Sequence, residues 1–348
     1  MSEALILNSV GMMSPLGLNA ASGCAAIRAR LSRFEEIPFH DFRGHPIVAS
    51  VAPEGATNQQ GYKRLVRLLA GALRECTANR IERLARPDVP LLVVIGESER
   101  PDYPDRFSER LRDELQTILN VSLSAPFLVF YEGKAGVFRA LDKARQLLQD
   151  RSTSACVVAA ADSFINAKAL DWLERHDKLK TEAQSDGVIP GEAAAALWVS
   201  RESTSDTALL EIIGLGFGEE ETVRTGEPNV AIGLTHALRD ALKDAQLSCA
   251  DVDFRVGGMT GEREEFMEAS TAIARIQRVH KEHFELWVPA EMLGHVGAAL
   301  GACMIVVTAM AMNRKYGPGR TAILFAGSYS PHRAACVVRA AKGVVSHG

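Results

Sequence analysis

Hydrophobic positions along the chain follow two alternating patterns. Short apolar runs, such as 91–95 (LLVVI) and 127–130 (FLVF), are typical of buried strands. Longer segments repeat apolar residues at helical spacing, as 135–149 does. The alternation predicts an α/β protein with largely parallel sheets. In the first half we expect strands at 4–7, 47–51, 91–95, 127–130, 155–160 and 194–199, and helices at 19–30, 62–76, 105–119 and 135–149.

The same order of elements begins again after the polar stretch 200–207 (SRESTSDT). We therefore predict two α/β halves, 1–203 and 204–348, packed as a pseudo-duplicate. The second half is expected to contain strands at 209–215, 252–256, 286–289, 322–325 and 335–338, and helices at 231–245, at 264–276 and from Val296 onward.

One segment, Leu293–Asn313, contains no Lys, Arg, Asp or Glu and is long enough to span a membrane. It is rich in Gly and Ala and carries His295 near one end, where a membrane span favours apolar or aromatic residues. A helix that is apolar on all sides also suits the interior of a large protein. We expect a buried helix between two sheets and no membrane partner.

Composition narrows the class of protein. The chain has 348 residues, 47% of them hydrophobic, with 39 basic and 43 acidic side chains and a formal charge of −4. This is an ordinary globular composition, and without a clustered basic stripe a nucleic-acid partner is not expected. The six cysteines have no CxxC spacing and the N-terminus has no signal-peptide pattern, which favours free thiols and a cytoplasmic location.

Sequence motifs for common cofactors are absent. The chain has no P-loop, no HExxH, no GxSxG and no dinucleotide fingerprint with a downstream acid. Asp102 and Asp105 share a proline-containing loop, which is more typical of a solvated turn than of a metal site. We expect neither a cofactor nor a metal.

Three glycine-punctuated segments, 11–17 (GMMSPLG), 186–197 (DGVIPGEAAAAL) and 294–302 (GHVGAALGA), carry a family resemblance. In this order they resemble signature stretches of the β-ketoacyl-acyl carrier protein synthases, and 155–162 (ACVVAAAD) resembles the strand that follows the nucleophile helix in that family. The resemblance covers nearly the whole chain. It implies the thiolase fold, with duplicated α/β halves in an αβαβα arrangement, and a homodimer.

The resemblance also implies an active site that has lost most of its catalytic residues. Such an enzyme needs a cysteine thiolate at a strand-to-helix elbow and two imidazoles. Here the cysteine position falls on Gly133 and the first histidine position on Gly258. The family lysine falls near Ala290, and only His295 is retained.

The remaining residues near this site allow different interpretations. His295 is a candidate catalytic residue, as an oxyanion donor, or else a helix N-terminal histidine bonded to backbone. Lys134 is mainly cationic at neutral pH and is expected at the surface or in contact with an anion. Glu192 matches a family acid and is expected to be buried and hydrogen-bonded. None of the six cysteines is predicted at a strand-to-helix elbow.

We therefore hypothesise a ketosynthase-like pseudoenzyme that acts by binding. Its partner is expected to be an acyl carrier protein or an active ketosynthase subunit. Alternatively it is an adaptor in a bacterial pathway, resembling accessory proteins encoded beside type VI secretion effectors, and its partner is then a secreted effector. The opposing hypothesis is an acyltransferase or β-ketoacyl synthase that acts on acyl thioesters without a cysteine, using His295 and Lys134.

Overall fold

A computed structural model describes residues 3–53, 61–78, 80–103, 106–202 and 208–341 of the chain. The strands are β1 (Leu5–Met13), β2 (Phe34–His40), β3 (Pro46–Ser50), β4 (Leu91–Val94), β5 (Phe127–Phe130), β6 (Cys156–Ser163), β7 (Glu192–Ser200), β8 (Leu210–Glu219), β9 (Phe254–Gly257), β10 (Leu286–Trp287), β11 (Thr321–Gly327) and β12 (His332–Ala340). The α-helices are α1 (Ala20–Arg28), α2 (Gly61–Cys76), α3 (Phe107–Leu119), α4 (Gly136–Leu147), α5 (Ala167–Arg175), α6 (Thr222–Thr225), α7 (Ile232–Asp244), α8 (Arg263–Ile276), α9 (Ala290–Leu293) and α10 (Ala299–Asn313).

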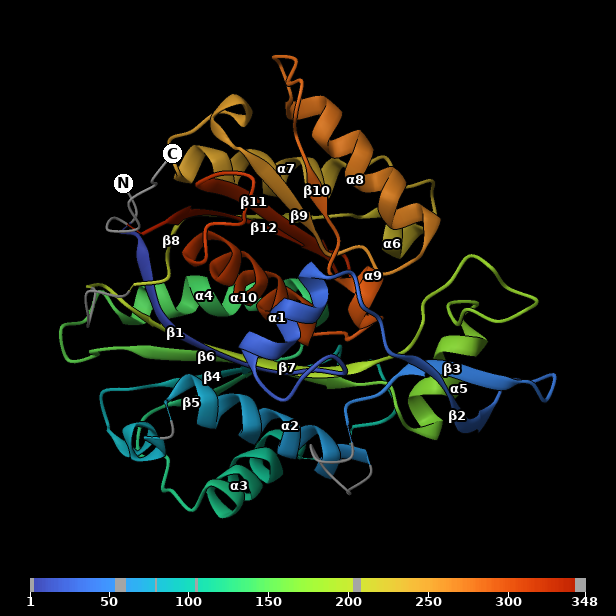
Figure 1. Ribbon diagram of the computed structural model, residues 1–348, viewed down its shortest axis with the longest axis horizontal. Helices are drawn as coiled ribbons and strands as arrows, with labels where there is room; N and C mark the ends of the chain where they lie inside the picture. The colour runs from blue at the N-terminus through green and yellow to red at the C-terminus, as the bar shows by residue number, and fades with distance from the viewer. Residues whose placement is uncertain (1–2, 54–60, 79, 104–105, 203–207, 342–348) are drawn as a thin grey trace.

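These elements form five layers, helix, sheet, helix, sheet, helix (Figure 1). Helices α2 and α3 cover the outer face of one sheet layer, β1-β7-β6-β4-β5. Helices α1, α4 and α10 form the middle layer, and α7 and α8 cover the outer face of the second sheet layer, β10-β9-β11-β12-β8. The expected αβαβα arrangement is therefore confirmed.

The two sheet layers are hydrogen-bonded to each other at one corner. Most of β1 pairs antiparallel with β7, but its first residues, Leu5–Leu7, pair with Leu210–Ile212 of β8. Ile6 and Leu7 pair with β7 as well, so this end of β1 lies between β7 and β8, and a register shift in the β1–β7 pairing follows Leu7. The strands of the layer β1-β7-β6-β4-β5 come from before residue 203, and those of the layer β10-β9-β11-β12-β8 come from after residue 207. The boundary proposed at residue 203 itself lies outside the described residues.

The expectation of largely parallel sheets was wrong. Strand β4 pairs parallel with β5 and β6, and β9 pairs parallel with β10 and β11. The pairs β1–β7, β6–β7, β1–β8, β8–β12 and β11–β12 are antiparallel. Antiparallel neighbours need no helical crossover. Strands β11 and β12 are joined by the loop 328–331, and α5, which lies between β6 and β7 in the chain, packs against β2 and β3.

The uncharged segment forms α10 in the middle layer, as expected for a buried helix. Thirteen of its fifteen residues, from Ala299 to Met312, are buried, and they contact strands of both sheet layers. Asp162 accepts a hydrogen bond from the Ala298 N–H (2.9 Å) just before the helix. Within the described part of the chain, no helix is long and apolar enough to cross a membrane.

Strand β2 and helix α5 were not predicted, and both belong to a small subdomain built from the β2–β3 hairpin and α5. The short helices α6 and α9 were not predicted either. Strand β2 contains Pro38, which argues against a central strand, but β2 lies in a two-stranded sheet where a missing N–H is tolerated. Helix α5 begins at Asn166, whose side chain accepts a hydrogen bond from the Ala169 N–H. The sequence signals that could have indicated this helix were Asn166 as an N-cap and the helical spacing of Ala169, Leu170 and Leu173, which are buried in the structure.

Candidate functional site

The strand-to-helix elbow lies where β5 passes into α4 through the short helical turn Gly133–Ala135. Gly133 has a φ of 58°, in the left-handed region that glycine tolerates best. A Cβ atom built on Gly133 would lie 2.0 Å from Oε1 of Glu97. A carboxyl group therefore occupies the space into which a side chain at this elbow would point.

Glu97 follows β4 and is 6% exposed. Its Oε1 accepts a hydrogen bond from the backbone N–H of Tyr329 at 3.2 Å. Burial raises the pKa of the Glu97 carboxyl, and the nearby Arg100 partly opposes that effect. Glu97 was not among the site residues predicted from the sequence. Its position at the carboxyl end of a strand that neighbours β5 in a parallel pair was the signal that could have identified it.

His295 lies in the loop before α10, between two aromatic rings. Its ring centroid is 4.4 Å from that of Phe164 and 5.5 Å from that of Tyr329. The side chain is 1% exposed, and neither ring nitrogen has a hydrogen-bond partner among the described residues. The expectation that backbone groups satisfy this imidazole was therefore wrong. The catalytic assignment of His295 stays a prediction.

The second degenerate position, Gly258, follows β9 and faces β11. A Cβ atom there would lie 2.7 Å from the Ala326 Cβ. The neighbouring strand thus leaves no room for a side chain, and none of the described residues provides a second imidazole at this point.

Lys134 follows Gly133 and is only 2% exposed, so the expectation of a surface lysine was wrong. Its ammonium group forms an ion pair with Glu265 of α8 and lies 3.4 Å from Oγ1 of Thr260. Glu265 also accepts a hydrogen bond from the Thr260 hydroxyl at 3.0 Å. The anion that Lys134 contacts is therefore part of the protein.

The loop between β11 and β12 closes over the elbow. The hydroxyl of Ser328 donates a hydrogen bond to the Glu132 carbonyl (2.5 Å) and accepts one from the Ala135 N–H (3.0 Å). The next residue, Tyr329, covers His295. These bonds fix the loop to both sides of Gly133.

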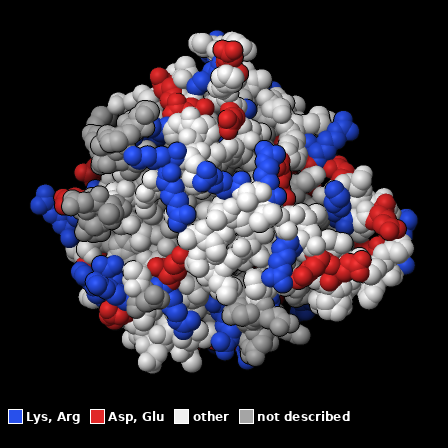
Figure 2. Space-filling model, in the orientation of Figure 1, with Lys and Arg blue, Asp and Glu red and all other residues white. Residues whose placement is uncertain are grey.

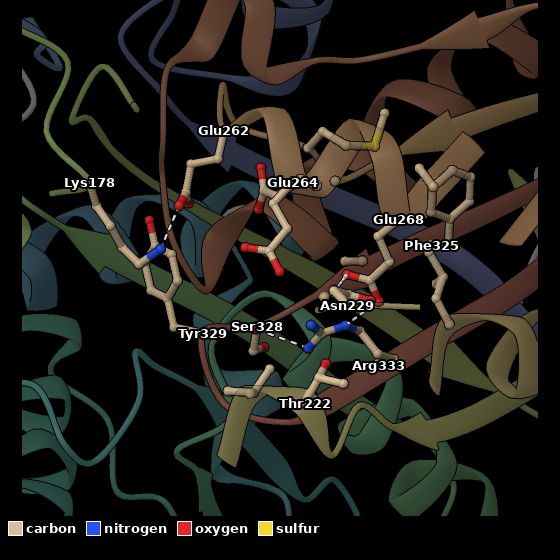
Figure 3. A pocket seen from close by; sticks show the side chains of 18 of the residues that line it. Lys178, Thr222, Asn229, Glu262, Glu264, Glu268, Phe325, Ser328, Tyr329 and Arg333 are labelled. Atoms are coloured by element: carbon tan, nitrogen blue, oxygen red, sulfur yellow. Dashed lines mark hydrogen bonds and ion pairs between the residues drawn. The ribbon is translucent and has the colours of Figure 1, made fainter. Parts of the chain in front are cut away.

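A cleft of about 340 Å³ leads from the surface to this loop and to Gly258 (Figure 3). Its walls carry two ion pairs, Lys178–Glu262 at 2.5 Å and Arg333–Glu268 at 2.6 Å. Figure 3 shows the Glu264 side chain beside the open space, with no marked interaction to its neighbours. The lining contains five glutamates against one lysine and one arginine: Glu227, Glu262, Glu264, Glu265, Glu268, Lys178 and Arg333.

Comparisons with known proteins identify the fold through structure. No family model and no curated protein matches the sequence. Among solved structures, the ishigamide ketosynthase/chain length factor is similar at a TM-score of 0.78 and 16% identity, over 98% of this chain and 100% of that one. The ketosynthase ApeO in complex with its chain length factor ApeC, from Xenorhabdus doucetiae, is similar at a TM-score of 0.73 and 15% identity, over 97% of this chain and 98% of that one. A type II acyl-carrier protein in complex with its ketosynthase (AntDE:AntF) is similar at a TM-score of 0.80 and 14% identity, over 98% of this chain and 100% of that one.

The chain has the ketosynthase fold.

This ketosynthase fold is therefore the thiolase-like arrangement that the glycine-rich segments implied. The six cysteines of the chain are all buried free thiols. Burial raises the pKa of Cys24, Cys76 and Cys156 to about 12 and raises those of Cys249, Cys303 and Cys336 as well. None lies in the elbow 130–136, as predicted.

Two buried acids support the ketosynthase-fold scaffold around the site. Glu192 accepts hydrogen bonds from Arg64, the Ser163 hydroxyl and a backbone N–H, so its predicted structural role is confirmed. Asp102 was expected in a solvated turn, but its side chain is 7% exposed and pairs with the buried Arg100 at 2.8 Å. Asp105 lies outside the described residues.

Replacing His295 with phenylalanine is expected to stabilise the protein by about 1 kcal/mol at pH 7, because two buried ring nitrogens without partners are removed. Burial and the nearby Lys134 and Arg100 hold the pKa of His295 well below its ordinary value near 6.5. Below pH 6.5 the unfolded chain thus gains a proton that the folded chain does not, and stability falls as the pH falls.

His295→Phe should remove the part of the stability loss at low pH that His295 causes. Urea unfolding at pH 7 and pH 5 would measure this difference in the free energy of unfolding. The matched change at the exposed His236 on α7 should alter neither value. A His295→Phe protein that is less stable than the wild type at both pH values would contradict the interpretation.

Proposed function

We propose that this ketosynthase-fold protein does not catalyse Claisen condensation and acts by binding another protein, as a partner subunit of an active ketosynthase. The observation that carries the proposal is the Glu97 carboxyl at the Gly133 elbow. Condensation needs a nucleophile at that point, and here the Glu97 carboxyl, from the segment after β4, fills the space of the missing side chain.

The surrounding groups support the same conclusion. His295 is shielded between Phe164 and Tyr329 and is 1% exposed, so an acyl thioester has no open route to its ring nitrogens. Lys134 is paired with Glu265, and an ammonium held in an ion pair is a poor nucleophile. An acyltransferase that uses these two residues would have to break both arrangements.

The cleft favours a ketosynthase partner over an acyl carrier protein. A carrier protein presents its acyl group on a phosphodiester-linked arm, which is anionic. The excess of glutamates over basic side chains in the lining would repel that charge on the way to Gly258. Among the similar structures, one is a ketosynthase in complex with its chain length factor, and another is a ketosynthase in complex with an acyl-carrier protein.

Intact-mass and product analysis after incubation with acyl carrier protein and acyl-coenzyme A thioesters tests the loss of chemistry. The expected result is an unchanged mass and no product. An acyl adduct or a turned-over product would contradict the proposal and favour the acyltransferase alternative. An adduct on Lys134 would identify that residue as the acylated group.

Copurification from the native host tests the binding role. Recovery of a ketosynthase subunit supports the proposal. Recovery of an acyl carrier protein alone would contradict the proposed ketosynthase partner and favour the carrier protein. Recovery of a secreted effector would favour the adaptor hypothesis.

We also propose that the chain forms a homodimer through β5. This strand is at the edge of the sheet, pairs only with β4 among the described residues, and consists of four half-buried apolar residues (FLVF). An apolar strand edge of this kind is a template for pairing with a second strand.

Val129→Lys on β5 should weaken self-association at least about tenfold, because two copies would bring like charges together at the paired edges. Sedimentation equilibrium would measure the change, with circular dichroism to check that the variant is folded. The same substitution at the half-exposed Val48 of β3 is the control and should have no effect. Equal association of the wild type and both variants would exclude β5 as the interface.

A further inference from the structure

A second cavity lies away from the degenerate site, between α1, the segment from β10 to α9, and the C-terminal part of α10. Its volume is about 250 Å³. A water molecule in the liquid takes up about 30 Å³, so the cavity suits a ligand of roughly eight to ten non-hydrogen atoms. It shares no lining residue with the cleft that leads to Gly258.

The inner walls of this cavity are apolar. Ile27, Val288 and Val307 line it and are at most 8% exposed. Cys24 also lines it, and burial raises the pKa of its thiol to about 12, so the group stays protonated and behaves as a small apolar side chain. Trp287 packs against Phe254 at a centroid distance of 5.0 Å and adds an aromatic wall.

The rim of the cavity is positively charged. Arg28 and Arg30 line it, and neither forms an ion pair within the described residues. The Arg28 guanidinium lies 4.4 Å from the centroid of the Tyr316 ring, another lining residue. Glu291 is the single acidic residue of the lining. Figure 2 shows a surface without charged residues near the centre of this face, bordered by Lys and Arg side chains with Asp and Glu side chains among them.

We propose that this cavity binds a short amphipathic carboxylate, with the aliphatic chain among the apolar walls and the carboxylate at Arg28 and Arg30. An apolar pocket with a small number of polar groups at one end is the usual form of a small-molecule site. Arginine without an acidic partner favours a carboxylate, because its planar donors match the two carboxylate oxygens. This site is independent of the acyl chemistry that the elbow has lost.

Calorimetric titration of the full chain with octanoate, octan-1-ol and octylammonium at low salt tests the proposal, since the three probes share one chain and differ in charge. We expect octanoate to bind at least about tenfold more tightly than octylammonium. Arg28→Gln and Arg30→Gln should each weaken octanoate by about tenfold and leave octanol unchanged. The control Arg239→Gln removes an exposed arginine of α7 and should leave octanoate binding within twofold.

The location is tested separately. Octanoate should change the fluorescence of Trp287, and Trp287→Phe should remove that change while binding is retained. Met292→Phe, at a half-buried position of the lining, should reduce the cavity and weaken octanoate and octanol together. The proposal is overturned if octanoate does not bind at millimolar concentration, if octylammonium binds equally well, or if Arg239→Gln weakens octanoate as much as Arg28→Gln does.

Discussion

Gly133→Ala should lower the free energy of unfolding by about 3 kcal/mol, measured by urea denaturation. Two effects combine. An alanine at a φ of 58° costs about 1 kcal/mol in backbone strain. The new Cβ atom would also meet the Glu97 carboxyl at 2.0 Å, and relieving this overlap costs about 2 kcal/mol. Glu97 can move only by giving up its hydrogen bond from the Tyr329 N–H within a buried site.

Gly44 provides the matched control for backbone strain. It has a φ of 85°, and no atom lies within 4 Å of a Cβ built on it. Gly44→Ala should therefore show only the backbone cost. In the Glu97→Ala background, the effect of Gly133→Ala should fall to the value found at Gly44. If Gly133→Ala costs the same with and without Glu97, the carboxyl does not occupy the elbow, and the proposed loss of condensation loses its main support.

Much of the fold could be predicted from local sequence patterns. Strand 127–130 was predicted at its observed bounds, and the uncharged segment was correctly placed between the two sheet layers. These predictions depend on apolar runs and periodicity, which are local properties of the chain. Strand direction is set by how distant segments pair, so the largely parallel sheet was predicted incorrectly.

For the site, the sequence predicted which side chains are missing but not what replaces them. The elbow at Gly133 follows from the local pattern of strand, glycine and helix. The carboxyl that fills it comes from Glu97, in the segment after β4. Lys134 was expected at the surface or in contact with an anion, but that anion could not be identified, because Glu265 is 131 residues away in the sequence. Contacts of this range are created by the tertiary fold and leave no sign in the spacing of neighbouring residues.

A buried ion pair between Arg100 and Asp162 connects three parts of the fold around the site. Arg100 and Asp162 have fully buried side chains and lie 2.8 Å apart. The Arg100 guanidinium also lies 4.0 Å from the centroid of Phe164, the ring that stacks on His295. Asp162 in turn accepts the Ala298 N–H before α10. The pair therefore links the loop after β4, strand β6 and the start of the central helix.

Asp162→Ala should lower the free energy of unfolding by about 3 kcal/mol, because the buried Arg100 guanidinium loses one of its two carboxylate partners and keeps only Asp102. The Ala298 N–H and the Ser163 N–H lose an acceptor at the same time. Urea unfolding would measure the loss. Asp171→Ala, in an exposed pair with Arg175, is the control and should leave the midpoint of unfolding unchanged.

Removing the charges of Arg100 and of both its carboxylate partners distinguishes the effect of buried charge from the loss of packing. Arg100→Met with Asp162→Leu and Asp102→Asn removes all three charges and leaves no buried carboxylate without a partner, so it should be more stable than Asp162→Ala. If the triple variant is as unstable as the single one, the main contribution of Asp162 is its bonds to the backbone at α10. Asp162→Asn then distinguishes the two, because an amide still accepts the Ala298 N–H but carries no charge.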